Sequence, residues 1–294
     1  MSERRKALIV DGEAGGSWHR WQETTPVLAK LLTETGLFST EVVTLRGSGV
    51  LMPQDVPDFN AFDVVVMNYE APDDRWSPDL KTTFENYMAA GGGLVVYHGA
   101  SAGFAGWREY NEMTGLGGWG GRNASAGHYC YVQDDVVVND DSDGPTGSHG
   151  VRLPFQVITR EPEHPITLGL PGSWMHFADE LYDRLRGPGS DLVILATAFS
   201  APDNTGSGRH EPVLMTVTSR GGRVFHTTLG HDVMSMSCPG FIATFQRGCE
   251  WAATGAVSQA LPAGFPTAHV VSRVDVLELD PAYRYGLNPI DDVR

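Results

Sequence analysis

The sequence predicts an α/β fold with a mostly parallel central sheet in one large domain. Three features lead to this prediction. Apolar runs such as Lys6–Asp11 alternate with helical segments, several runs are apolar at nearly every position, and one of them, Leu94–Tyr97, lies between glycines in the stretch GGGLVVYHGASAG. Alternating strands and helices form right-handed βαβ units, which build parallel sheets. Continuously apolar strands are typical of sheets covered on both faces.

The first hundred residues are predicted to hold four strands and two helices. The first helix is expected from Val27 to Thr35, because Thr25-Pro26 favours a helix start and Gly36 a stop. The second is expected from Ser77-Pro78 to Ala90 on the same grounds. The four apolar runs predict strands at residues 6–11, 38–44, 62–68 and 94–97.

The alternation loosens between about residues 115 and 160, where glycine-rich stretches predict an insertion with antiparallel strands at 136–138 and 155–159. Further strands are expected at 192–198, 213–218 and 223–229, and the turn at Gly221-Gly222 predicts a hairpin at an antiparallel edge of the sheet. A helix is expected over Pro239–Thr254, ending at Gly255. We therefore predict a domain of residues 1–255, with residues 256–294 as a tail that packs on it or serves in association.

Composition limits the partners and the compartment. The 294-residue chain has a net charge of −15 and a pI near 5.0, which argues against nucleic acid or an anionic membrane as a partner. No run approaches the ~20 apolar residues of a membrane span, and the apolar run Ala7–Val10 is too short for a signal peptide. Cys130, Cys238 and Cys249 form neither a disulfide framework nor a CxxC metal site. We expect a cytoplasmic protein.

His98 is the first candidate for chemistry, because it directly follows the strand Leu94–Tyr97. Ligands of open α/β sheets bind outside the carboxyl ends of the strands, and the small residues after His98 allow a sharp turn into a helix. The alternative is that this histidine merely caps the helix.

Three other polar segments are also expected at strand ends. Trp18-His19-Arg20-Trp21 follows the first strand, and its indoles suit the apolar face of a sugar, although they could instead staple the next helix. In Asp179-Glu180, one carboxylate could point inward, where burial near histidines would shift its pKa as acid–base catalysis needs; the alternative is an acidic pair on the surface. His231-Asp232 follows the strand near residue 228 and suits a base or a metal site.

The remaining histidines are less informative. His128 and His149 lie in the predicted insertion, from which they could reach the site, although glycine neighbours also suit ordinary loops. His226, inside a predicted strand, is interpreted as a satisfied core residue.

Several motifs together resemble the ThuA-like (trehalose utilisation) family. They are the Trp-His segment after the first strand, Tyr97-His98-Gly99-Ala100, His164-Pro165-Ile166-Thr167, Asp179-Glu180-Leu181-Tyr182, Gly222-Arg223-Val224-Phe225, Leu229-Gly230-His231 and Trp251-Ala252-Ala253-Thr254-Gly255. The resemblance implies a flavodoxin-like three-layer sandwich similar to class I glutamine amidotransferases. Those enzymes carry a cysteine at the turn where this chain has His98, which argues against thiol glutaminase chemistry.

The resemblance also implies a role in carbohydrate catabolism. We expect an enzyme that cleaves or isomerises a (3-keto-)glycoside or disaccharide, with a divalent metal as an open question. His98, Glu180 and His231 are the predicted catalytic residues and the candidate metal ligands. The predicted substrate-binding residues are Trp18, His19, Trp119, His128, Asp179 and Asp232. The alternatives are a non-catalytic carbohydrate-binding or regulatory module and a metal-dependent hydrolase of another polar small molecule. A homo-oligomer is left open.

Overall fold

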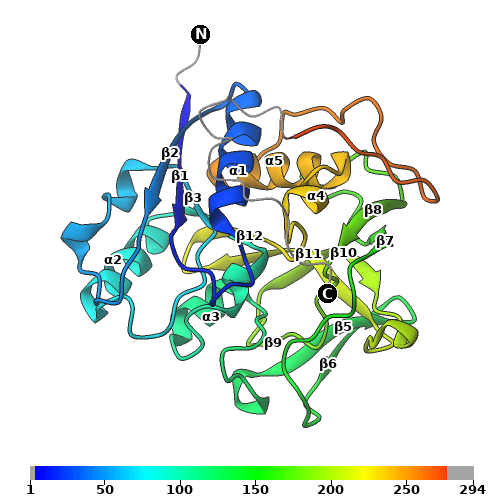
Figure 1. Ribbon diagram of the computed structural model, residues 1–294, viewed down its shortest axis with the longest axis horizontal. Helices are drawn as coiled ribbons and strands as arrows, with labels where there is room; N and C mark the ends of the chain where they lie inside the picture. The colour runs from blue at the N-terminus through cyan, green and yellow to red at the C-terminus, as the bar shows by residue number, and fades with distance from the viewer. Residues whose placement is uncertain (1–3, 277–294) are drawn as a thin grey trace.

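The computed structural model describes residues 4–276, and its first half alternates strands with helices (Figure 1). The elements there are β1 (Arg5–Asp11), α1 (Trp21–Glu34), β2 (Phe38–Thr44), β3 (Val64–Met67), α2 (Pro78–Ala89), β4 (Gly93–Tyr97) and α3 (Arg108–Thr114). The second half contains β5 (His128–Gln133), β6 (Val136–Asp140), β7 (Leu153–Thr159), β8 (Ser173–Asp179), β9 (Arg186–Gly187), β10 (Leu192–Phe199), β11 (His210–Ser219), β12 (Gly222–Thr227), α4 (Val233–Met236) and α5 (Pro239–Thr254). Short 3-10 helices occupy Pro53–Asp55, Phe59–Ala61, His98–Ala102, Ala124–Ala126 and Pro202–Asn204.

One mixed sheet runs through the molecule in the order β2-β1-β3-β4-β12-β11-β10-β7-β8, and β5 joins it beside β11. The strands from β2 to β12 in this order are all parallel to their neighbours. The pairings from β12 to β8 are all antiparallel. The parallel carboxyl ends of β1, β3, β4 and β12 therefore meet at one edge, where the site is found.

Helices cover the parallel part of the sheet on both faces, which explains its continuously apolar strands (Figure 1). In β1, Ala7 and Ile9 pack in the cluster that includes α1 and α5, whereas Leu8 and Val10 pack in the cluster that includes α2 and α3. Side chains alternate between the two faces of a strand, so every position of such a strand must be apolar.

The antiparallel part of the sheet corrects the prediction of a mostly parallel sheet with only an antiparallel edge. The β11–β12 hairpin is present with its turn at residues 220–221, but it lies in the interior of the sheet. Strands β7, β8, β10 and β11 follow one another without an intervening α-helix. Connections without a crossover helix join antiparallel neighbours, so half of the sheet runs antiparallel.

Two predicted helices also differ from the structure. Helix α1 begins at Trp21 rather than at Val27, because Pro26 lies inside the helix instead of opening it. The segment after β4 is a 3-10 helix of five residues, His98–Ala102, rather than an α-helix. By contrast, α2 begins after the predicted cap Ser77, whose hydroxyl accepts a hydrogen bond from the Leu80 N–H, and α5 spans Pro239–Thr254 as predicted.

Residues 256–276 run along the domain near β7, β8 and α4. The Met175 N–H donates to the Thr267 carbonyl over 2.8 Å, the Gln156 side-chain amide donates to the Ala268 carbonyl, and Phe265 contacts Trp174. The predicted tail boundary and the predicted insertion stay predictions, and the part of the tail after residue 276 lies outside the described residues.

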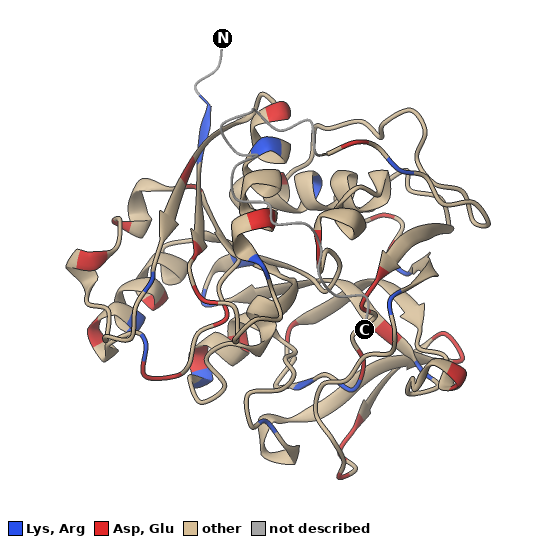
Figure 2. Cartoon of the chain, in the orientation of Figure 1, with Lys and Arg blue, Asp and Glu red and all other residues tan. Residues whose placement is uncertain are grey.

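Along the described part of the chain in Figure 2, the Lys and Arg positions are scattered among Asp and Glu positions rather than gathered in one part of the fold. None of the helices between residues 4 and 276 is long and apolar enough to cross a membrane. All three cysteines are free and buried.

Candidate active site

His98 sits at the sharp turn that ends β4, and its backbone has a φ of 43°. This left-handed conformation is uncommon for a residue with a side chain and is found preferentially at functional turns. The buried imidazole is fixed by its Nδ1–H, which donates to the Thr228 carbonyl at the end of β12 over 2.6 Å. Its other nitrogen, Nε2, faces Tyr182 and His231.

Asp179 orients the loop that carries His231. Its carboxylate accepts hydrogen bonds from the N–H groups of Gly230 (2.7 Å) and His231 (3.1 Å), and from His176 Nε2 at 2.8 Å. Burial opposes the charged form of His176, but the bond to Asp179 outweighs it and raises the pKa of His176 to about 9. Burial likewise opposes ionisation of Asp179, and the bond from His176 overcomes this and lowers the pKa of Asp179. A buried ion pair behind the site thus fixes the loop.

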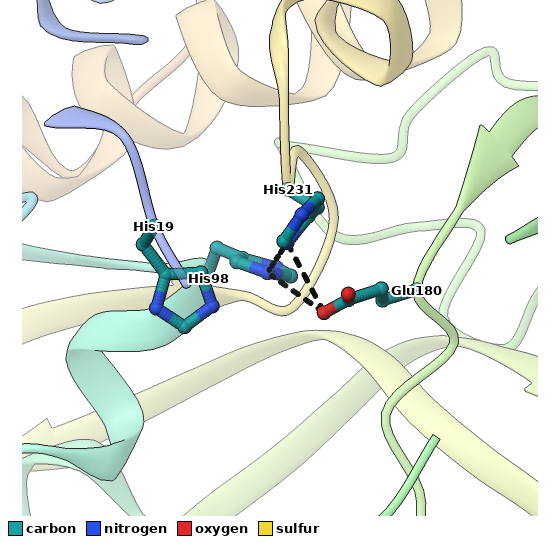
Figure 3. Close-up of side chains that lie close together, drawn as sticks. All are labelled: His19, His98, Glu180 and His231. Atoms are coloured by element: carbon teal, nitrogen blue, oxygen red, sulfur yellow. Dashed lines mark hydrogen bonds and ion pairs between the residues drawn. The ribbon is translucent and has the colours of Figure 1, made fainter. Parts of the chain in front are cut away.

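Glu180 comes directly after Asp179, and its side chain points toward the histidines (Figure 3). Its Oε2 lies 3.1 Å from His231 Nδ1 and 3.8 Å from His98 Nε2. Burial would favour the neutral acid, but the bonds to His231 and His98 hold the pKa of Glu180 well below its ordinary range. Glu180 is therefore a carboxylate at neutral pH.

The two neighbouring histidines respond to Glu180 differently. Burial lowers the pKa of His98 below its usual value, so this ring is neutral. Burial acts in the same direction on His231, but its bond to Glu180 prevails and raises the pKa of His231. A histidine whose neutral form is favoured thus stands beside one whose charged form is favoured, with 3.3 Å between His98 Nε2 and His231 Nδ1.

His19 approaches the same point from the loop between β1 and α1 (Figure 3). Its Nδ1–H donates to Glu70 Oε2 over 2.7 Å, and the Tyr182 hydroxyl lies 3.0 Å from its Nε2. The same hydroxyl lies 2.7 Å from His98 Nε2. Gly99 leaves room for this ring, because a Cβ there would lie 2.4 Å from His19 Nδ1.

One ligand atom from each of His19, His98, Glu180 and His231 lies within 4.8 Å of the other three. Imidazole nitrogens with a carboxylate oxygen are a donor set suited to zinc and to other divalent transition metals. Among the described residues, these four side chains form the group of possible ligands that lie close enough together to hold such an ion.

A cavity of about 800 Å³ opens over the cluster. Trp18, which is 72% exposed, and Trp119 provide apolar surfaces in its wall, and Glu13, Glu70, Arg75 and His149 provide polar ones. The volume is in the range of small-molecule sites, and aromatic faces beside hydrogen-bonding groups suit a sugar-sized polar molecule.

The structure brings most of the predicted site residues together, but three of the predicted substrate-binding residues lie elsewhere. His128 begins β5 opposite Gly187 and lies outside the cavity wall. Asp232 caps α4 by accepting the Ser235 N–H and forms an ion pair with Arg152. Asp179 is buried behind the loop, as described above, so it has a positioning geometry rather than a substrate-facing one. The functional roles of all predicted residues stay predictions.

Two residues of the site had no role in the sequence analysis, namely Glu70 and Tyr182. Glu70 lies just beyond β3, so the rule that located His98 would also have found it. Tyr182 follows the Asp179-Glu180 pair within a motif quoted above, and its hydroxyl joins His19 to His98. The sequence analysis gives His149 as a residue that could reach the site from the predicted insertion. In the structure it lines the cavity, and its Nε2 lies 3.7 Å from Glu180 Oε2.

The fold and the site define a class: a mixed α/β protein with a histidine–glutamate cluster in a cavity at the carboxyl ends of its parallel strands. The sequence profile described as ThuA, trehalose utilisation, matches residues 6–252. The chain therefore belongs to the ThuA family.

Solved structures agree with this assignment. A ThuA-like protein from Parabacteroides merdae is 40% identical with a TM-score of 0.88, and the match covers 93% of this chain and 99% of that one. A ThuA-like protein from Bacteroides uniformis is 19% identical with a TM-score of 0.57, over 87% of this chain and 95% of that one. A cytoplasmic protein from Salmonella typhimurium shares the fold at 14% identity and a TM-score of 0.50, over 84% of this chain and 98% of that one. No curated protein matches the chain.

Proposed function

We propose that this protein is a cytoplasmic enzyme of carbohydrate catabolism that cleaves or isomerises a (3-keto-)glycoside or disaccharide. The observation that carries the proposal is the convergence of His98, Glu180 and His231 on one point beneath a cavity with two tryptophans in its wall. The family's association with trehalose utilisation supports a sugar as the substrate class.

The chemistry needs a base, an acid and a group that stabilises negative charge. A ketone at C3 acidifies the proton at C2, and removal of that proton gives an enolate from which the C1–O bond breaks by elimination. Addition of a proton at a different carbon would give an isomer instead. Burial favours the neutral form of His98 and Glu180 favours the charged form of His231, so the pair suits a proton acceptor and a proton donor within 3.3 Å of each other.

The alternative is a non-catalytic carbohydrate-binding or regulatory module. Such a protein needs the two tryptophans but has no need for buried ionisable groups held at fixed distances. The buried ion pair of Asp179 and His176 fixes the loop that carries His231. This favours an enzyme, because catalysis requires that the reacting side chains be held in one orientation.

Turnover of a 3-keto-disaccharide, compared with the unoxidised disaccharide, tests the proposal. We expect the parent to consume the keto-sugar, and the variants His98→Gln and Glu180→Gln to lose at least about 100-fold in kcat/KM. His269→Gln serves as the control and should match the parent, because His269 is exposed and belongs neither to the cavity wall nor to the histidine–glutamate cluster. Variants that turn over the keto-sugar as fast as the parent would exclude the assigned residues. Binding of the disaccharide without turnover of either sugar would favour the binding module.

A further inference from the structure

We infer that His19 Nε2, His98 Nε2, His231 Nδ1 and Glu180 Oε2 form a binding site for one divalent transition-metal ion. This site changes the assignment of His19 from a substrate-binding residue to a metal ligand. It is argued from hydrogen bonding and geometry alone and does not depend on the identity of the substrate.

The first argument comes from the far sides of two rings. His98 donates its Nδ1–H to the Thr228 carbonyl, and His19 donates its Nδ1–H to the Glu70 carboxylate. In the neutral form, which is the form that binds a metal, each imidazole has only one N–H, so its Nε2 carries a lone pair that faces the cluster. Metal-binding histidines show this arrangement, in which a carbonyl or carboxylate accepts from the other ring nitrogen.

The second argument is a shortage of donors inside the cluster. Three acceptor atoms face its centre: the Nε2 lone pairs of His19 and His98 and the Glu180 oxygen. The donors that reach them are the single hydroxyl proton of Tyr182 and one N–H of His231. Buried acceptors are nearly always satisfied, so the arrangement suits a cation at the centre.

The third argument is the spacing of the ligand atoms. Zinc–nitrogen and zinc–oxygen bonds of ~2.0–2.2 Å in a tetrahedral site place ligand atoms roughly 3.3–3.6 Å apart. The separations among His98 Nε2, His231 Nδ1 and Glu180 Oε2 are 3.3, 3.1 and 3.8 Å. One ring nitrogen of His19 lies within 4.8 Å of the other three atoms, and Nε2 is the nitrogen that Glu70 leaves free, so a small rotation of the ring completes the set.

The fourth argument is access. His98 is buried, whereas the side chains of His19, Glu180 and His231 retain 18%, 13% and 14% of their exposure. Three of these residues therefore border solvent, and His19 and Glu180 line the cavity wall. A bound ion would be enclosed on the sheet side and would face the cavity on the other side. Because four protein ligands fill a tetrahedral shell, a small molecule would reach the ion by expanding its coordination to five.

Metal titration of the full-length protein tests the site without any substrate. The protein is treated with a chelator, desalted and titrated calorimetrically with Zn²⁺, Mn²⁺, Co²⁺ and Ni²⁺ in turn, and the Co²⁺ complex is also examined by visible absorption. We expect one equivalent of at least one of these ions to bind. His19→Gln and Glu180→Gln change partly exposed side chains, so they should fold, and each should weaken binding by at least about 100-fold.

Two further variants sharpen the result. Glu70→Gln keeps all four ligands but alters the partner that orients His19, and should weaken binding by roughly 10- to 100-fold. His269→Gln should bind as the parent does. Absence of binding by the parent for all four ions, or unchanged affinity in both His19→Gln and Glu180→Gln, would overturn the inference. Since the titration contains no sugar, the metal site can fail while the enzyme proposal stands. With an ion bound, His98 and His231 would act as its ligands rather than as base and acid, so proton transfer would then fall to other groups of the site.

Discussion

The substitution Gly99→Ala should disable the site by displacing one histidine without altering any ionisable group. Gly99 follows His98 in the turn after β4, and a Cβ built on it would lie 2.4 Å from His19 Nδ1 and 2.6 Å from His19 Cε1. Its backbone is not in the left-handed region, so alanine is tolerated conformationally. The added methyl group therefore acts on the His19 ring.

The size of the displacement follows from the contact. An ordinary carbon contact begins near 3.4 Å, so the ring must move by about 1 Å. Such a shift breaks the 2.7 Å bond from His19 to Glu70 and turns Nε2 away from the cluster. A misplacement of ~1 Å at an active site can cost about 100-fold in rate. Metal affinity should fall by roughly 10- to 100-fold, as when a ligand loses its orienting partner.

The effect on stability should be small by comparison, because His19 lies on a loop at the cavity wall and its ring can rotate into the cavity. We expect Gly99→Ala to change the unfolding free energy by less than about 1 kcal/mol, below the ~1–3 kcal/mol of overpacking a closed core. Calorimetric Zn²⁺ titration and urea unfolding measure the two quantities. Gly172→Ala, at a glycine with open space around it, is the matched control. Parent-like metal affinity and turnover in Gly99→Ala would refute the place assigned to His19.

Three further predictions concern buried ionisable groups. Burial raises the pKa of Glu211 to about 7 from 4.5, so its contribution to stability is present below pH 4.5 and lost as the pH rises through 7. Glu211→Gln should therefore raise the unfolding free energy at pH 8 by up to about 3 kcal/mol, with no gain at pH 4.5, in paired urea titrations. Burial lowers the pKa of His226 to about 4 from 6.5, so its contribution is present above pH 6.5 and lost as the pH falls through 4. Between pH 6.5 and 4, the unfolding free energy of His226→Gln should therefore fall by about 3 kcal/mol less than that of the parent. An equal fall in both proteins would contradict a neutral, buried His226. Asp179→Asn should destabilise the fold by about 3 kcal/mol, because it leaves His176 as a buried charge without its partner; a loss below about 1 kcal/mol at pH 7 would count against this role.

The parts of the fold that the sequence predicts best are those with strong local signals. Strands β1 and β2 and helix α5 lie where the apolar runs and the terminal glycine Gly255 place them. Helix α1 was predicted to start too late, because Pro26 is ordinarily an N-terminal residue and here lies inside the helix. The extent of the antiparallel half was underestimated, because strand direction depends on which strands pair, and pairing is not encoded by local patterns.

The site shows the same division between local and distant information. Placing residues at the carboxyl ends of strands was enough to nominate His98, Glu180 and His231, and the structure places them side by side. Asp232 is predicted to bind substrate, although its sequence context, with Ser235 three residues on, also forms a capping box, and this is the role it has in the structure. The partnership of Glu70 with His19 joins residues 51 positions apart, and it becomes visible only when β1 and β3 are paired.

The clustered side chains belong to four separate loops, which follow β1, β4, β8 and β12 and span residues 19 to 231. No shorter segment of the chain can assemble this site, so a ligand that touches all four loops binds the folded protein and ignores the unfolded one. Such a ligand raises the free energy of unfolding, by about 4 kcal/mol when its free concentration is 1,000-fold above its Kd. The concentration of the ligand would thereby govern how fast the protein is degraded by proteases, as well as the fraction of sites that are filled.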